Sequence, residues 1–230
     1  MPDTCPTLLI VAQSGRLTYE AVLFAASLRA SAPDFTGKLV IAEPRPGPLW
    51  NGDPGISDDD ARDFLTNLGA EIRSFDNQHF GKTYPPGNKI EALSTLDKDE
   101  RFVFFDTDTL ITGPLDQIAF NFDRPSASMA RTDTWPDPPL YGPSYAEIWH
   151  AIYDRFNVPF EPTLDTKQPD DHWERYLYFN AGWFYARDPS DFRDRMLDVM
   201  TSLRDEPMEV LASQSIFPWL DQIALPVVIS

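Results

Sequence analysis

The chain has 230 residues, 42% of them hydrophobic, so it is long enough for one large domain and is not a disordered protein. Its formal net charge of −17 argues against nucleic acid or an anionic membrane as the main partner. The single cysteine, Cys5, excludes an internal disulfide and a cysteine-based zinc site. Since no signal peptide or long apolar span stands out, we expect a soluble, cytoplasmic protein without a transmembrane segment.

The first half of the sequence alternates segments typical of strands with segments typical of helices. Short apolar runs predict strands at 7–12, 38–42 and 101–105, and a further short strand is predicted at 71–74. Helical patterns are predicted at 18–31, 57–69 and 88–96, with Ser57 as the N-cap of the second helix. Strands that alternate with helices favour an α/β fold of the Rossmann-like type, with a mostly parallel central sheet flanked by helices.

The second half is less regular. Residues 120–143 are rich in aromatic residues and proline, and helices are predicted at 145–155 and 190–203, the latter capped by Ser190. A strand is predicted at 176–186, and the apolar C-terminal run through Val227, Val228 and Ile229 predicts a final strand.

Two carboxylates follow the apolar run Phe102–Phe105. Asp106 and Asp108 are separated by one residue, so on an extended chain they project to the same side. We expect them at the carboxyl end of a central strand, where open α/β sheets bind their ligands. Carboxylate oxygens suit Mg²⁺ or Mn²⁺, and such an ion would hold a diphosphate. The alternative is a strand followed by an acidic turn, closed by Gly113 and Pro114.

Three further segments accompany this motif. Asn88-Lys89 opens the preceding helix, Asn180-Ala181-Gly182 interrupts a later strand, and Asp221-Gln222 lies near the C-terminal end. Together with the motif, they resemble the metal-dependent nucleotide-sugar glycosyltransferases of the glycogenin-like family 8 and its relatives. The resemblance extends from Thr7 to about Leu225. It implies a single GT-A domain over residues 1–230, with a nucleotide-binding half at about 1–115 and an acceptor-side half at about 116–230.

The resemblance implies a role for each motif residue. The metal ligands would be Asp106 and Asp108. The nucleotide-sugar site would include the base-stacking Tyr19, Lys89 at the diphosphate or sugar, Asp106, Thr107, and Asn180, Ala181 and Gly182 against the sugar. The catalytic residues would be Asp221, Gln222 and Asn180. The expected donor is a UDP-sugar, the expected acceptor a saccharide or another hydroxyl compound, and the expected outcome is retention of anomeric configuration. Independently of the resemblance, the aromatic region Trp135–Trp149 would form an acceptor wall, since sugar rings pack on aromatic faces.

Each assignment has a structural alternative. Tyr19 would be an aromatic on a helix surface, and Lys89 a solvated lysine in a first helical turn. The segment Asn180-Ala181-Gly182 would be a bulge, Asp221 would cap the final segment, and residues 135–149 would be ordinary core and loop packing.

The sequence departs from the family pattern at one place. Those enzymes usually take a third metal ligand from a histidine near the C-terminus, which is followed by a basic segment. The sequence up to Ser230 contains no such histidine, so we expect either a further C-terminal segment that supplies it, substitution by His172 or water, or weak metal binding.

Two other functions fit the motif. One is a haloacid-dehalogenase-like phosphatase, in which Asp106 would be the nucleophile and Asp108 the acid/base. That pattern expects Thr or Val where the chain has Leu110, and it usually lies near the N-terminus. The other is a non-catalytic domain that binds a nucleotide sugar or a metal on the same fold.

Overall fold

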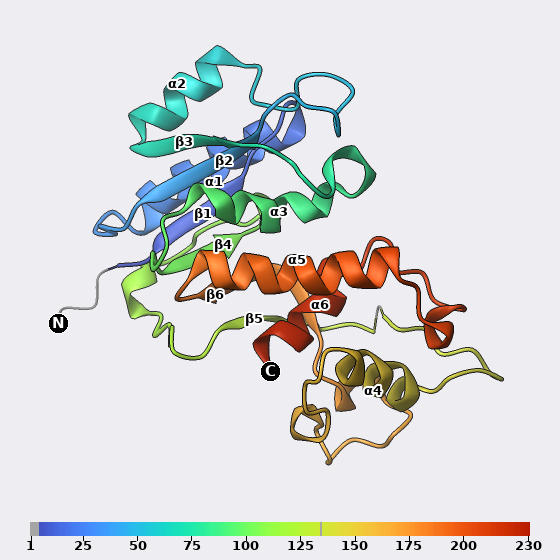
Figure 1. Cartoon of the computed structure of the whole chain (residues 1–230). Coiled ribbons are helices and arrows are strands. Elements are labelled where there is room, and N and C mark those ends of the chain that lie inside the picture. Colours follow the sequence, from blue (N-terminus) through green and yellow to red (C-terminus); the bar gives the residue numbers. More distant parts are fainter. Residues whose placement is uncertain (1–4, 134) are drawn as a thin grey trace. The chain divides into compact units, whose positions relative to one another are not determined.

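Strand β1 (Thr7–Val11) is buried along its whole length and apolar after Thr7, which places it inside a sheet. The computed structural model describes residues 5–133 and 135–230. The strands form one six-stranded sheet in the order β3-β2-β1-β4-β6-β5 (Figure 1). The other strands are β2 (Leu39–Pro44), β3 (Ala70–Phe75), β4 (Phe102–Phe105), β5 (Ser126–Met129) and β6 (Phe179–Ala186). The α-helices are α1 (Arg16–Ser31), α2 (Asp59–Asn67), α3 (Asn88–Glu91), α4 (Tyr145–Arg155), α5 (Pro189–Asp205) and α6 (Leu220–Ile229).

Most neighbouring strands in this sheet run parallel. Strand β1 pairs in parallel with β2 and with β4, and β2 pairs in parallel with β3. Strand β4 pairs with β6 in the antiparallel direction, with Phe104 opposite Phe184. The prediction of an α/β fold with a mostly parallel central sheet is therefore confirmed.

The chain forms two compact units. The first contains the residues up to Ser126 together with Gly182–Arg193, and the second contains Ala127–Ala181 and Asp194–Ser230. Strands β1 to β4 with helices α1 to α3 lie in the first unit, whereas α4 and α6 lie in the second.

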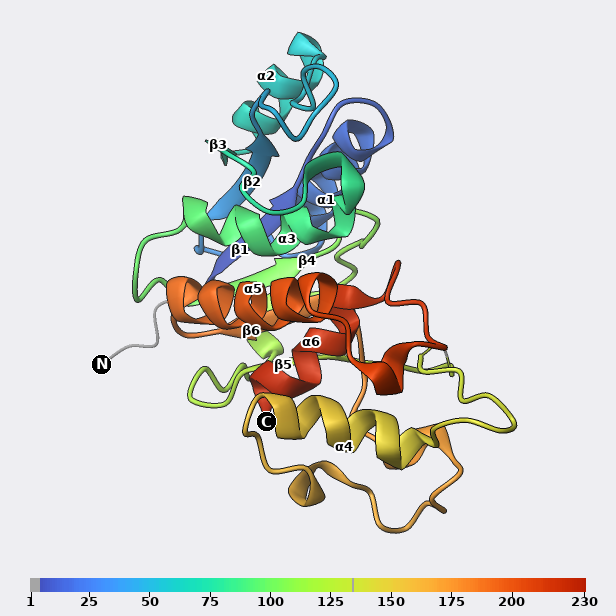
Figure 2. The same cartoon turned by 45° about the vertical axis from the view of Figure 1, so that its right-hand side comes forward.

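The first unit buries both faces of its strands. One face packs on α1 and α2, in a cluster that includes Ile10, Phe24, Leu65 and Val103. Because side chains alternate along a strand, Phe104 faces the opposite side, where it stacks on Phe184 at 4.7 Å between ring centroids. Figures 1 and 2 show α3 on this second side of the sheet, away from α1.

The second unit is built around aromatic residues. Trp149 of α4 is buried and packs edge-on against Trp135, with 5.1 Å between ring centroids. Ser144 caps α4: its side chain accepts a hydrogen bond from the backbone of Glu147, whose carboxylate accepts from the Ser144 backbone in return. Helix α4 has the predicted bounds, and the aromatic side chains around Trp149 form the core of this unit.

The prediction of a C-terminal strand is wrong, because residues 220–229 form helix α6. This helix buries Leu220, Asp221 and the whole run from Ile223 to Val228. A helix that is buried nearly all round lacks the polar face that marks amphipathic helices. Its apolar run cannot be told from a strand by periodicity.

Smaller differences concern caps and short elements. Helix α2 is capped by the Asp58 side chain and not by Ser57, and Asp188 caps α5 in place of Ser190. The predicted helix at 88–96 is a single α-turn, Asn88–Glu91, followed by a 3₁₀ segment. Strand β5 was not predicted, because its sequence Ser-Ala-Ser-Met lacks the β-branched and aromatic residues typical of strands.

Candidate functional site

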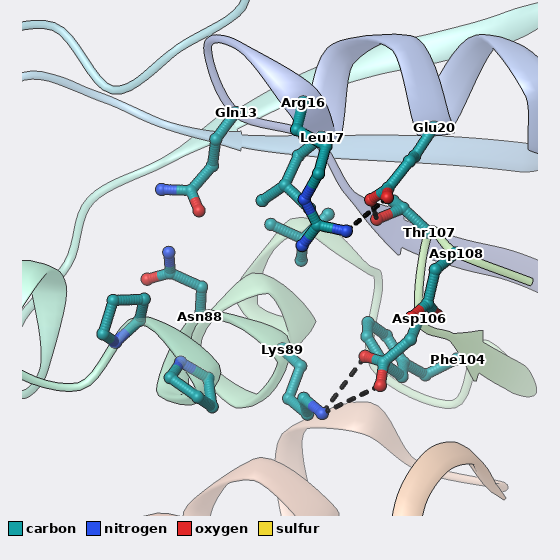
Figure 3. Close-up of a pocket in the computed structure, with 13 residues that line it drawn as sticks. Gln13, Arg16, Leu17, Glu20, Asn88, Lys89, Phe104, Asp106, Thr107 and Asp108 are labelled. Atoms are coloured by element: carbon teal, nitrogen blue, oxygen red, sulfur yellow. Dashed lines mark hydrogen bonds and ion pairs between the residues drawn. The ribbon is translucent and has the colours of Figure 1, made fainter. Parts of the chain in front are cut away.

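A pocket of about 280 Å³ lies in the first unit, beyond the carboxyl ends of β1 and β4 (Figure 3). Three chain segments line it: the end of β1 with the start of α1, the start of α3, and the end of β4. Their lining residues are Val11, Gln13, Arg16, Leu17 and Glu20; Pro85, Pro86, Asn88 and Lys89; and Phe104, Asp106, Thr107 and Asp108. This is the place where parallel α/β sheets bind ligands.

The turn between β1 and α1 forms one wall of the pocket. Gly15 has a φ of 81°, a left-handed conformation that glycine adopts without a steric cost. The Thr18 hydroxyl donates a 2.6 Å hydrogen bond to the Gln13 carbonyl and fixes the turn. The chain therefore reverses directly after the strand, and Gln13 is held at the pocket.

Lys89 and Asp106 form an ion pair inside the pocket. The Lys89 ammonium lies 3.1 Å from Oδ1 of Asp106 and 5.7 Å from the centre of the Phe104 ring. The Lys89 side chain is only 11% exposed, whereas that of Asp106 is 36% exposed. The structure thus brings together two residues that lie in separate sequence motifs, and it gives Lys89 a reason to occupy the first turn of α3.

A second set of polar contacts joins the end of β4 to the start of α1. The buried Thr107 hydroxyl donates to Oε2 of Glu20 at 3.4 Å, and Arg16 pairs with the same carboxylate. Three carboxylates and two cationic side chains therefore line the pocket. An anionic ligand such as a diphosphate would need more positive charge than these side chains provide.

A divalent cation held by Asp106 and Asp108 would supply that positive charge. Both carboxylates line the pocket, and their hard oxygens suit Mg²⁺ or Mn²⁺. Within residues 5–133 and 135–230, no three His, Cys, Asp or Glu side chains group as a metal site. Two carboxylates still fit Mg²⁺, which is commonly bound by one or two carboxylates together with substrate phosphates and water.

Glu91 fixes the segment that carries Lys89. Its buried carboxylate accepts hydrogen bonds from the backbone N–H groups of Gln78, His79 and Phe80. It also accepts from the side chain of Asn77 at 3.0 Å. A single buried acceptor therefore ties the loop at 77–80 to α3.

Gly182, of the segment Asn180-Ala181-Gly182, contacts the Asp106 backbone. The Gly182 carbonyl accepts a 2.8 Å hydrogen bond from the Asp106 backbone, which extends the β4–β6 ladder into the motif. Ala181 has a φ of 57°, uncommon for a residue with a side chain, and is buried in the second unit. Asn180 is exposed in the same unit and accepts a hydrogen bond from Ser128.

The remaining predicted residues do not line this pocket. Tyr19 is exposed, and its hydroxyl donates to Asp58 at 3.1 Å, which raises the pKa of that hydroxyl. In the second unit, Asp221 is 2% exposed in the first turn of α6 and Gln222 is half-buried beside it. His172 is also in the second unit, and its Nε2 lies 3.4 Å from Oε2 of Glu174. Their roles in the reaction stay predictions.

The structure adds pocket residues to which the sequence had assigned no role. They are Gln13, Arg16, Leu17, Glu20, Asn88 and Phe104, with Val11, Pro85 and Pro86. Those around Gln13 follow the first strand, so the rule that parallel strands end at one edge of the sheet was the available signal.

Comparison with known proteins identifies a family. The sequence model of the family described as the Rhodobacterales glycosyltransferase domain matches residues 8–230. No curated protein matches the sequence significantly.

Similar solved structures have low sequence identity to the chain. One is the galactosyltransferase LgtC in complex with donor and acceptor sugar analogs, with a TM-score of 0.54 and 13% identity over 97% of this chain and 70% of that one. An active-site glutamine-to-glutamate mutant of LgtC has a TM-score of 0.52, with 13% identity over 96% of this chain and 70% of that one. The bifunctional glycosyltransferase WbbM in its apo form has a TM-score of 0.50, with 15% identity over 99% of this chain and 38% of that one. These likenesses confirm the expected GT-A type of fold. Among the described residues, no helix has the length and apolar character required to cross a membrane.

Proposed function

The chain belongs to the Rhodobacterales glycosyltransferase family, and from this premise we propose that it transfers a sugar from a nucleotide-diphosphate sugar to a hydroxyl group. The expected donor is a UDP-sugar, and the expected acceptor is a saccharide or another hydroxyl compound. The observation that carries the proposal is the pocket in which Asp106, Asp108 and Lys89 meet at the carboxyl ends of parallel strands. Family membership favours this function over the phosphatase alternative.

The proposed donor site joins negative and positive groups. Asp106 and Asp108 would hold Mn²⁺ or Mg²⁺, which when bound neutralises negative charge on the departing nucleoside diphosphate. Lys89, 3.1 Å from Asp106, offers a cation to phosphate or sugar oxygens beside the metal ligands. Thr107 and Gly182 support the site through their hydrogen bonds to Glu20 and to the Asp106 backbone.

The residues that face the reacting sugar carbon are proposed from the family resemblance. Asp221 and Gln222 of α6, with Asn180, would stabilise positive charge at that carbon through their carboxylate and carboxamide oxygens. Asn180, Ala181 and Gly182 would lie against the donor sugar, and Tyr19 would contact the base. Transfer with retention and a cytoplasmic location belong to the same proposal.

Donor binding is tested first, because it does not require the acceptor. Melting of the purified chain is followed with UDP-, GDP- and ADP-sugars, each with and without Mn²⁺. We expect one class of nucleotide sugar to raise the melting temperature, and to do so much more with Mn²⁺. Absence of any shift at saturating concentrations of all these compounds would contradict the proposal.

A further inference from the structure

The side chain of Asn88 is buried in the wall of the pocket with one polar atom unused. Asn88 is 2% exposed, and its Nδ2 has no hydrogen-bond partner in the part of the chain that the structure describes. Its Oδ1 accepts a 2.7 Å hydrogen bond from Nδ2 of Asn77. Because buried donors are almost always paired, an amide nitrogen without a partner in a pocket wall points to an acceptor atom of a ligand.

The neighbours of Asn88 determine which end of its amide faces the pocket. The indole N–H of Trp50 donates to Oδ1 of Asn77 at 2.8 Å, and an indole has no acceptor to offer. The Asn77 carbonyl must therefore face Trp50. Its Nδ2 is left to donate to Oδ1 of Asn88 and, at 3.0 Å, to Glu91.

This arrangement prevents the Asn88 amide from turning over. A turned amide would place its NH₂ group against the NH₂ group of Asn77, so that two donors faced each other and Asn77 kept only its hydrogen bond to Glu91. Asn77 cannot turn in response, because Trp50 on one side only donates and the Glu91 carboxylate on the other accepts. Asn88 therefore presents a hydrogen-bond donor to the pocket.

We propose that Asn88 binds the nucleotide part of the donor, by donating from Nδ2 to an acceptor oxygen of the nucleoside diphosphate. This inference rests on the proposed function. Asn77 and Trp50 are then positioning residues, since they act on the ligand through the orientation of Asn88.

The position of Asn88 indicates the nucleotide and not the transferred sugar. In Figure 3 the Asn88 amide points toward that of Gln13, on the side of the pocket away from Asp106 and Asp108. Gln13 also lines a neighbouring pocket of about 330 Å³, formed with residues that include 50–54. The polar surface thus continues from Asn88 along the β1 turn, where these folds hold nucleotides.

The test is calorimetric binding of UDP, UDP-glucose and uridine to the whole chain in Mn²⁺. The variant Asn88→Ala removes the donor, and Asn88→Asp keeps the side-chain shape but places an acceptor against the ligand oxygen. We expect Asn88→Ala to raise the Kd for UDP and for UDP-glucose alike, by about tenfold. Asn88→Asp should bind both more weakly still, and it also serves if the alanine variant folds poorly. The control is Asn67→Asp, which makes the same chemical change at an exposed residue that ends α2 and should leave each Kd unchanged.

The uridine measurement identifies the oxygen. If the oxygen belongs to the base or ribose, the Asn88 variants should raise the Kd for uridine as well as the Kd for UDP. If it belongs to the diphosphate, they should raise the Kd for UDP and leave that for uridine unchanged. Both results support the proposal. Unchanged Kd values in Asn88→Ala, or a loss confined to UDP-glucose with UDP unaffected, would overturn it.

A double-mutant cycle tests the positioning role of Trp50. Trp50→Phe removes the N–H that orients Asn77, so it should weaken UDP binding to the wild-type chain but have little further effect in Asn88→Ala. Additive losses would overturn the positioning role and assign Trp50 an independent contact. If the wild-type chain binds none of UDP, GDP and ADP, the proposed function fails and this inference with it. Binding to wild type with equal binding to the Asn88 variants would overturn only the inference.

Discussion

The ammonium group of Lys89 lies 3.1 Å from one carboxylate oxygen of Asp106 and 3.4 Å from the other. Asp106 is one of the two proposed metal ligands, so a protein cation already lies beside the carboxylate that would hold the ion. Under the proposed function, metal and lysine would therefore compete for Asp106 in the free protein. A bound diphosphate would give the lysine a second anionic partner, so that both cations could be accommodated.

Replacement of Lys89 by Met should change two affinities in opposite directions. Binding of UDP-glucose should weaken by about tenfold or more, because a charged hydrogen-bond donor is lost. Binding of Mn²⁺ without nucleotide should tighten by roughly threefold to tenfold, because a like charge beside the ligand is removed. Calorimetry measures the first, and the paramagnetic resonance signal of free Mn²⁺ measures the second. Weaker Mn²⁺ binding in Lys89→Met would refute the competition.

Asp106→Asn and Asp108→Asn should each remove the metal dependence of donor binding. An amide oxygen is a weaker ligand than a carboxylate, and the site has only two such ligands among the described residues. We expect the Kd for UDP-glucose in Mn²⁺ to rise at least about tenfold, with the circular dichroism spectrum unchanged. Asp63→Asn, at an exposed position of α2, is the matched control. Wild-type metal dependence in both pocket variants would be incompatible with the proposed metal site.

The sequence predicted most of the sheet and part of the site. Strands β1, β2 and β4 are apolar enough to be recognised alone, and the position of Asp106 after β4 follows from the parallel sheet. The role of Asn88 could not be predicted, because its orientation depends on Trp50 and Asn77, which come from other loops. Helix α6 was mistaken for a strand because burial on nearly all sides removes the helical pattern.

Glu91→Gln should destabilise the fold and weaken donor binding together. The glutamine NH₂ group would face some of the backbone N–H groups that now donate to the carboxylate, leaving buried donors unpaired. We expect a loss of about 1–3 kcal/mol in the free energy of unfolding, measured in urea. The surface variant Glu71→Gln should change this free energy by less than about 0.5 kcal/mol. Equal stability of the two variants would show that Glu91 does not hold the loop.

The stability of the first unit should depend on pH through Glu43. Burial alone raises the pKa of this carboxyl, but hydrogen bonds from Arg62, from the Ile56 backbone and from Ser74 outweigh burial and lower it. Because the folded-state pKa lies below the unfolded value, the stabilisation is present above the unfolded pKa of about 4.3 and is lost as the pH falls through the folded pKa.

Glu43→Gln tests this linkage. At pH 7 we expect a loss of about 1–3 kcal/mol, less than for a fully buried ion pair, because the Arg62 side chain is 34% exposed. The difference from wild type should shrink as the pH falls below about 4.3. Urea unfolding at several pH values measures it, and a difference that is constant from pH 7 to pH 3 would argue against the ion pair as the source.

Release of nucleoside diphosphate from nucleotide sugars tests the central claim most directly. The purified chain is incubated with UDP-, GDP- and ADP-sugars and a panel of saccharide acceptors, with Mn²⁺ or with a chelator, and free nucleoside diphosphate is measured. The proposed function predicts release from one class of donor, which requires the metal and is lost in Asp106→Asn. Phosphate release from simple esters without turnover of any nucleotide sugar would contradict it, and donor binding without turnover across the acceptor panel would indicate a binding domain in place of an enzyme.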